Sequence, residues 1–286
     1  MLRRITRLSQ AIHRGVRSLD NINSLLIDQE FDRLRNDPRF RAPKSLVPFG
    51  HKVYSQGDED GLIREVFSRI GLTNKVFVEF GIGDGLQNNT LSLLFDGWHG
   101  LWIDAASQSI NSIRKHFSSI INHQLQVIES VVTKENINDV ISGNLQDREI
   151  DLLSIDIDGN DCHVLGAITC IEPRVIIIEY NAKFAPPLRF CMDYNPLHTW
   201  KGDDCYGASL KFLESSLGDN GYCLVGCSLT GVNALFVRQD LVPDKFLEPF
   251  TAETHYQPSR LYLAGSSSGH LASYSSIARA LTTRCP

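Results

Sequence analysis

Apolar residues recur along the chain with two different periods, and the first change of period falls between residues 58 and 80. The stretch "DEDGLIREVFSRIG" (58–71) carries its apolar side chains three and four positions apart, as one face of a helix does, and it ends at a glycine. The next apolar run, "KVFVEF" (75–80), is short and continuous, which is typical of a strand buried on both faces. The pattern therefore predicts a helix followed by a buried strand.

The same alternation continues through the middle of the chain. Further strands are predicted in "GLWIDA" (100–105), "IINHQLQVIESVV" (120–132), "DLLSIDI" (151–157) and "RVIIIEY" (174–180). Between them, "NNTLSLLFDG" (88–97) and apolar positions 110, 113 and 117 indicate helices. Five strands alternating with helices predict an α/β fold, a doubly wound and mostly parallel sheet with helices on both faces.

An antiparallel hairpin is predicted at the C-terminal side of this sheet. Leucines at 210, 213 and 217 share one helical face, and two apolar runs joined by "SLTG" (228–231) follow them. A mostly parallel sheet commonly accepts such a pair at its edge. We therefore expect one domain over residues 51–264, with an N-terminal helical extension (1–50) and a Ser-rich C-terminal tail (265–286).

The extension opens with "MLRRITRLSQAIHRGVRSLD" (1–20), which predicts a basic amphipathic helix. Its apolar residues recur at helical spacing, it contains five arginines, and its first acidic residue is Asp20. Three roles fit this segment. It packs on its own domain or on a dimer partner, it contacts a membrane surface peripherally, or it is an organellar transit segment.

Composition and charge indicate which cellular compartment and which classes of partner to expect. The formal net charge of the 286-residue chain is -5, which gives no electrostatic reason to expect nucleic acid as a partner. Seven cysteines, an odd number without a CxxC pair, favour reduced thiols and a cytoplasmic protein. No run of 18 apolar residues occurs, so no transmembrane helix is expected.

Three glycines follow the first predicted strand in "VFVEFGIGDGLQNNT" (76–90). Doubly wound sheets bind ligands beyond the carboxyl ends of their strands, where a glycine turn lets the backbone approach the ligand. A dinucleotide site would have the spacing GxGxxG, whereas Gly81, Gly83 and Gly85 give GxGxG. Glu79, two residues before the first glycine, would repel a pyrophosphate but would suit a ligand that carries an ammonium group.

A second acidic residue, Asp104, ends the second predicted strand. At that position its carboxylate is placed to accept hydrogen bonds from ribose hydroxyls. An ammonium group and a ribose together indicate S-adenosylmethionine, which joins an amino acid, a sulfonium cation and a ribose. The alternative is a glycine turn with a solvated carboxylate and no ligand.

These residues resemble the first motif of the class I S-adenosylmethionine-dependent methyltransferases. More narrowly, "YSQGDEDGLI" (54–63) resembles the S-Q-x-G-E-D opening of the FkbM-type methyltransferases, and "IDIDGNDCHVLGAI" (155–168) resembles their I-D-x-E-G-x-E stretch. The likeness runs from about residue 54 to residue 240. It implies a seven-stranded sheet of order 3-2-1-4-5-7-6 and methyl transfer, usually to oxygen.

This chain departs from the family in carrying Asp158 and Asp161 where glutamates are usual, which keeps the charge but shortens its reach. The expected donor site combines the first motif, the glycine turn and the strand ends. It consists of Gln56, Glu79, Gly81, Gly83, Asp84, Gly85, Asp104 and Asp156.

Polar side chains gather at the ends of the fourth and fifth predicted strands. These residues are Asp156, Asp158, Glu179 and Asn181, and neighbouring parallel strands would bring them to the same edge. Four oxygen ligands suit Mg²⁺ or another divalent cation rather than zinc. The arrangement is similar to the magnesium site of catechol O-methyltransferase. The alternative is that these groups only orient backbone and substrate by hydrogen bonds.

The expected catalytic residues are Asp156, Asp158 and His163. His163 ranks first as the base that takes the acceptor proton, ahead of His51 and His198, although any single histidine is more often an ordinary surface or core residue. The segment 181–209 is long and carries two adjacent prolines and several aromatics. We expect it to form the wall of the acceptor site, because long loops in compact domains are often functional.

The sequence therefore predicts an S-adenosylmethionine-dependent O-methyltransferase that acts on a hydroxyl of a sugar, a polysaccharide precursor or another small natural product. Two alternative functions remain open. One is a non-catalytic scaffold that keeps the fold and binds partners through its basic helix. The other is an NAD(P)-dependent oxidoreductase, which the glycine spacing disfavours.

Overall fold

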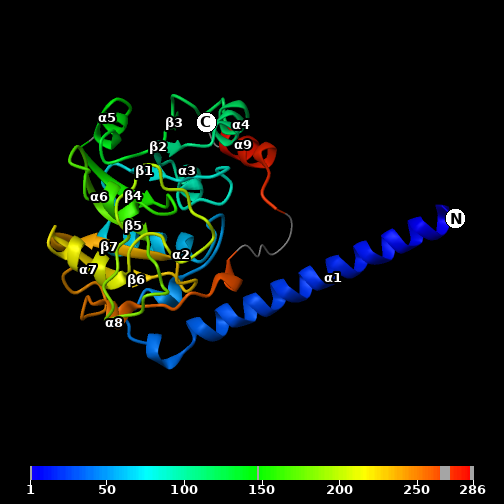
Figure 1. The fold of residues 1–286 in the computed structure, drawn as a ribbon, viewed down its shortest axis with the longest axis horizontal. Coiled ribbons are helices and arrows are strands. Elements are labelled where there is room, and N and C mark those ends of the chain that lie inside the picture. Colours follow the sequence, from blue (N-terminus) through cyan, green and yellow to red (C-terminus); the bar gives the residue numbers. More distant parts are fainter. Residues whose placement is uncertain (1, 147, 265–270, 284–286) are drawn as a thin grey trace.

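The computed structural model describes residues 2–146, 148–264 and 271–283, and its centre is one seven-stranded sheet (Figure 1). The strands are β1 (Val76–Phe80), β2 (His99–Asp104), β3 (Leu125–Glu129), β4 (Glu149–Ile155), β5 (Glu172–Glu179), β6 (Tyr222–Cys227) and β7 (Asn233–Arg238). Their order is β3-β2-β1-β4-β5-β7-β6, with β7 antiparallel to both of its neighbours and every other pair parallel. The structure confirms the expected strand order and the closing hairpin.

Helices cover both faces of the sheet, because successive strand residues point to opposite sides. The helices are α1 (Leu2–Arg35), α2 (Glu59–Ile70), α3 (Leu91–Phe95), α4 (Ser107–His116), α5 (Ile137–Ser142), α6 (Asp161–Leu165), α7 (Leu210–Gly218), α8 (Ala252–His255) and α9 (Tyr274–Thr282). Phe77 lies in one apolar cluster with α2, α3, α4 and α9, whereas Val76 and Val78 lie in the other with α5, α6, α7 and α8. Short 3₁₀ turns are η1 (Pro38–Phe40), η2 (Val47–Phe49), η3 (Gln239–Leu241) and η4 (Leu261–Leu263).

The C-terminal part of the chain belongs to the domain rather than to a separate tail. In α9, Ile277 and Leu281 are buried in the core. The Tyr274 ring stacks on His116 with centroids 4.6 Å apart, and its hydroxyl donates a hydrogen bond to the backbone oxygen of Asp84. The boundary expected at residue 265 therefore does not separate α9 from the domain. Residues 265–270 and 284–286 of the expected tail lie outside the described part of the chain.

The N-terminal helix α1 runs away from the sheet and contacts the domain only near its own C-terminal end (Figure 1). Ile27, Phe31 and Leu34 are buried against η1, η2 and the loop after β6. The preceding apolar stripe is open, with Ile12 59% and Leu19 67% exposed. From residue 12 to residue 26, the part of the stripe whose side chains are described, packing on the domain is therefore not observed. No helix in the described ranges is long and apolar enough to cross a membrane.

Candidate functional site

The glycine turn after β1 needs glycine for steric reasons. Gly81 has φ +73°, and a Cβ there would lie 1.5 Å from the backbone oxygen of Asp156. Gly85 also has a positive φ, and a Cβ there would press on Trp102 and Ile113 at 3.0–3.2 Å. The turn can therefore lie close against the end of β4 and over the core only because it carries no side chains at these positions.

Asp104 holds this turn in place from the end of β2. Its carboxylate accepts a 2.8 Å hydrogen bond from the backbone N–H of Gly83 and another from that of Ala106. The expected donor-site residues Asp104 and Gly83 are thus brought together. The contact with Gly83 fixes the conformation of the turn, which lines the cavities described below.

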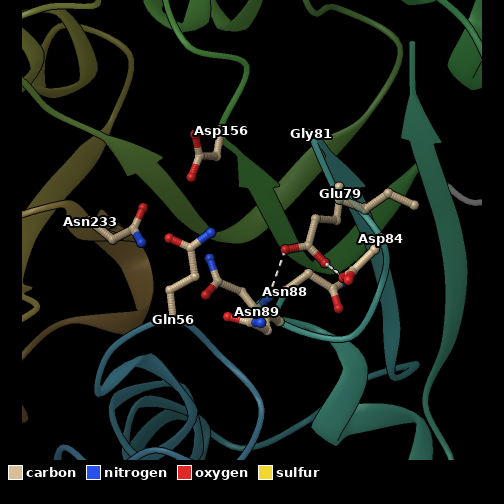
Figure 2. A pocket seen from close by; sticks show the side chains of 11 residues that line it. Gln56, Glu79, Gly81, Asp84, Asn88, Asn89, Asp156 and Asn233 are labelled. Atoms are coloured by element: carbon tan, nitrogen blue, oxygen red, sulfur yellow. Dashed lines mark hydrogen bonds between the residues drawn. The ribbon is translucent and has the colours of Figure 1, made fainter. Parts of the chain in front are cut away.

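Glu79 is buried at the end of β1, and its carboxylate is surrounded by donors from the loop before α3 (Figure 2). It accepts hydrogen bonds from the Asn88 side chain at 2.7 Å, from the Asn89 backbone at 2.9 Å, and from Thr90 and Ser154. Burial raises the pKa of Glu79. Its observed role is to order the loop, and its expected contact with a ligand ammonium group stays a prediction.

The acids of the segment "SQGDED" are buried and support the loop that carries Gln56. One oxygen of Asp60 accepts four hydrogen bonds, from three successive backbone N–H groups and the Ser55 hydroxyl. Glu59 accepts from the Gly57 N–H and from the side-chain amide of Asn233 on β7. These contacts join the start of α2 to the β6–β7 hairpin. Gln56 stays exposed at the site.

Two adjoining cavities lie at the carboxyl edge of the sheet and share Gln56, Gly81, Gly83 and Asp156. The smaller, about 250 Å³, is also lined by Glu79, Asp84, Asn88, Asn89 and Asn233 (Figure 2). The larger, about 610 Å³, runs from Asp104 and residues 130–132 to Glu179, and its outer wall includes Pro196, His198 and Trp200. This volume is within the range of small-molecule sites.

An acidic cluster lies at the larger cavity, which two of its members, Asp156 and Glu179, line. Single carboxylate oxygens of Asp156, Asp161 and Glu179 lie within 4.8 Å of one another. Both oxygens of Asp161 already accept backbone hydrogen bonds, from Ile157 at 2.8 Å and from Gly159 at 2.9 Å. By contrast, Oε2 of Glu179 is buried without a hydrogen-bond partner. Burial, followed by the charge of the other carboxylates, raises the pKa of Asp156 and of Glu179 well above the ordinary range.

The expected metal set differs from this cluster in three residues, Asp158, Asp161 and Asn181. Asp161 is present although it was not expected, whereas Asp158 is not in the cluster and lines the larger cavity, where burial, followed by the charge of Asp104, raises its pKa. Asn181 is fully buried, and its amide donates to the backbone oxygens of Asp204 and Tyr206. Its oxygen accepts from the Lys183 N–H, so Asn181 shapes the 181–209 segment and lines neither cavity.

The structure changes the order of the three histidines as candidate catalytic bases. Nε2 of His163, the base expected first, lies 2.7 Å from the backbone oxygen of Met192, and His163 lines neither cavity. His198 lines the larger cavity, and its Nε2 is buried without a partner. The structure therefore places His198 rather than His163 at the site. His51 contacts the backbone oxygen of Phe49 and lines neither cavity.

Comparison with known proteins gives one family match. Residues 65–202 match the model of the methyltransferase FkbM domain, and no curated protein matches the chain. Similar solved structures include a magnesium protoporphyrin IX methyltransferase from Synechocystis PCC 6803 with bound SAM, at 12% identity, TM-score 0.40, covering 63% of this chain and 77% of that chain.

Two other solved structures have similar scores. A SAM-dependent methyltransferase from Aquifex aeolicus has 12% identity and a TM-score of 0.39, covering 73% of this chain and 96% of its own. The glycopeptide N-methyltransferase MtfA complexed with SAM has 14% identity and a TM-score of 0.39, covering 69% of this chain and 99% of its own. The match to the methyltransferase FkbM domain covers residues 65–202, and the observed strand order is the one that the resemblance to this family implies.

Proposed function

We propose that this chain transfers the methyl group of S-adenosylmethionine to a hydroxyl of a sugar or another small acceptor. The observation that carries the proposal is the glycine turn held by Asp104 at one end of a 610 Å³ cavity whose other end is an acidic cluster. The turn and Asp104 suit the amino acid and the ribose of the donor. The matched family and the donor bound in similar structures support the same reading.

The reaction would be a direct displacement at the methyl carbon. The acceptor oxygen forms the new bond to carbon, and the bond between carbon and sulfur breaks with its electron pair left on sulfur, so that S-adenosylhomocysteine is released. The acceptor proton must pass to a base. His198 and the pair Asp156 and Glu179 line the cavity where the acceptor would lie, so these residues are the proposed bases and positioning groups. The cavity wall formed by Pro196 and Trp200 would exclude water and select the acceptor.

The acidic cluster also fits a divalent cation. Asp156, Asp161 and Glu179 would hold it, and the unpartnered Oε2 of Glu179 is the observation that favours this reading. Oxygen donors without thiolates suit Mg²⁺ or Mn²⁺. When bound, such a cation would lower the pKa of an acceptor hydroxyl.

Calorimetric titration with S-adenosylhomocysteine tests the donor site. We expect micromolar binding, weakened in Asp104→Ala by about 1 to 3 kcal/mol, or roughly 5- to 150-fold, because both Asp104 hydrogen bonds are lost. The matched control is Asp219→Ala, an exposed aspartate at the end of α7, which should bind as the wild type does. No binding by the wild type would remove the methyltransferase proposal and favour the scaffold. Binding of NADPH instead would favour the oxidoreductase.

The cation is tested by its own binding. Free Mn²⁺ measured by electron paramagnetic resonance should show one site in the wild type and at least tenfold weaker binding in Glu179→Gln, because one anionic ligand is lost. The control is Glu172→Gln at the opposite end of β5, where the carboxylate pairs with Arg148. If the wild type leaves millimolar Mn²⁺ free, the cluster holds protons rather than a metal.

A further inference from the structure

Two cysteines from different elements meet behind the acidic cluster. Cys162 lies in α6, directly after Asp161, and Cys191 lies in the long segment between β5 and α7. Their Sγ atoms are 2.9 Å apart, and both side chains are partly buried. Among the six cysteines that the structure describes, this is the one pair with a sulfur–sulfur hydrogen bond.

Contacts on both sides hold these sulfurs together. Cys191 forms an isolated antiparallel bridge with Ala208, and the neighbouring Met192 N–H donates to the Gly207 oxygen at 3.0 Å. From α6, Nε2 of His163 reaches the Met192 oxygen at 2.7 Å and lies 3.6 Å from the Cys191 sulfur. The approach of the sulfurs is therefore built into the packing of α6 on the segment.

We propose that Cys162 and Cys191 are a covalent modification site, at which a small-molecule disulfide such as oxidised glutathione converts the two thiols into a reversible disulfide. A disulfide bond requires sulfurs about 2.05 Å apart, so the two atoms need to approach by only about 0.9 Å. Side-chain rotation supplies such a shift more easily than backbone movement does. The other described cysteines have no sulfur partner and are expected to stay reduced or to form mixed disulfides.

The exchange balances without any further reagent. The Cys191 thiolate attacks one sulfur of the small disulfide and releases the first small thiol, which takes the proton that Cys191 has lost. The Cys162 thiolate then attacks the Cys191 sulfur and releases the second small thiol, which takes the proton from Cys162. Because either sulfur can donate the hydrogen bond between them, the two cysteines can also exchange these roles.

The cross-link would tie two parts of the candidate site to each other. It joins the helix that begins at Asp161 to the segment whose residues Pro196, His198 and Trp200 form the outer wall of the cavity. The donor-side contact between Gly83 and Asp104 lies at the ends of β1 and β2 instead. We therefore expect oxidation to change the acceptor KM and to leave the affinity for S-adenosylhomocysteine unchanged. The effect on KM rests on the proposed function, whereas the cross-link itself does not.

Peptide mapping of the full-length protein detects the cross-link directly. After incubation with oxidised glutathione and alkylation of free thiols, trypsin should release residues 149–174, which contain Cys162, joined to residues 190–201, which contain Cys191. A thiol count on the denatured protein should fall by at least two, and dithiothreitol should restore all seven thiols. The matched controls are Cys170→Ser, which removes the other cysteine of the first peptide, and Cys205→Ser, which removes the exposed cysteine of the same segment.

Both controls should keep the linked peptide, whereas Cys162→Ser and Cys191→Ser should each abolish it. Mixed disulfides with glutathione at all accessible cysteines, without the linked peptide, would overturn the proposal. So would zinc that copurifies with the protein, protects both thiols and is lost in Cys191→Ser, because the cluster of Cys162, His163 and Cys191 would then be a metal site. These outcomes do not depend on whether the protein transfers methyl groups.

Discussion

Asp58, in the motif "YSQGDEDGLI" (54–63), lies in an unfavourable buried environment that the sequence does not reveal. Its Oδ1 accepts a hydrogen bond from the Leu229 N–H at 2.9 Å, but its buried Oδ2 has no partner. Burial, followed by the charge of Glu59, raises the pKa of Asp58 to about 8. An unfolded aspartate has a pKa near 3.9. Between these values the folded protein holds a proton that the unfolded chain has lost, so stability falls as the pH rises through this window.

We predict that Asp58→Asn makes the stability of the protein less dependent on pH. The asparagine cannot ionise, so the loss of up to about 1.4 kcal/mol per pH unit that Asp58 contributes should disappear from the free energy of unfolding. Urea titrations at pH 5, 6.5 and 8 measure the slope, with the exposed Asp219→Asn as the control. Equal slopes in wild type and Asp58→Asn would show that the Asp58 carboxyl ionises normally in the folded protein.

At the scale of elements, α1 has two parts with different roles. Its last turns are anchored by Ile27, Phe31 and Leu34, whereas its apolar residues from Ile12 to Leu26 face solvent. Because the described part of the stripe is exposed and the same segment carries arginines, membrane contact and dimerisation remain predictions for this helix. The helical period alone indicated an amphipathic element, but which of its apolar residues are buried depends on where the chain folds back.

We predict that removing residues 2–24 changes the free energy of unfolding by less than about 0.5 kcal/mol, because the deleted side chains that the structure describes are mostly exposed. In contrast, Phe31→Ala should cost about 3 to 5 kcal/mol through the cavity it leaves next to Leu34 and Phe40. Chemical denaturation measures both values. A large loss in the truncated chain would mean that the exposed part of α1 is packed in solution.

For the whole molecule, the two edges of the sheet have opposite character. The carboxyl edge leaves polar atoms of Glu179 and His198 unpartnered around a cavity, as expected for a binding site. The other edge is closed by a buried ion pair between Arg174 on β5 and Asp151 on β4. Asp151 also accepts hydrogen bonds from Thr73 and Lys75, so both of its carboxylate oxygens are hydrogen-bonded within the protein.

We predict that Asp151→Ala lowers the free energy of unfolding by about 3 to 5 kcal/mol, because it leaves the Arg174 guanidinium buried without its counter-ion. Affinity for S-adenosylhomocysteine should be unchanged in the folded fraction, since the ligand site is at the opposite edge. The double variant Asp151→Leu with Arg174→Met should recover much of the loss. Equal losses in the single and double variants would indicate that packing, rather than the unpaired charge, is responsible.

Local sequence patterns predicted the sheet, the glycine turn and the acids at the strand ends, because these depend on local periodicity and on the shared edge of parallel strands. The strand order came only from the family resemblance. The tertiary structure alone decided which side chains meet there. Asn233 reaches Glu59 from far along the chain, His198 enters the cavity while His163 turns away, and Asp161 joins the acidic cluster. Asn181 is absorbed by the backbone of its own loop. Side-chain direction at a strand end depends on long-range packing, which no local pattern records.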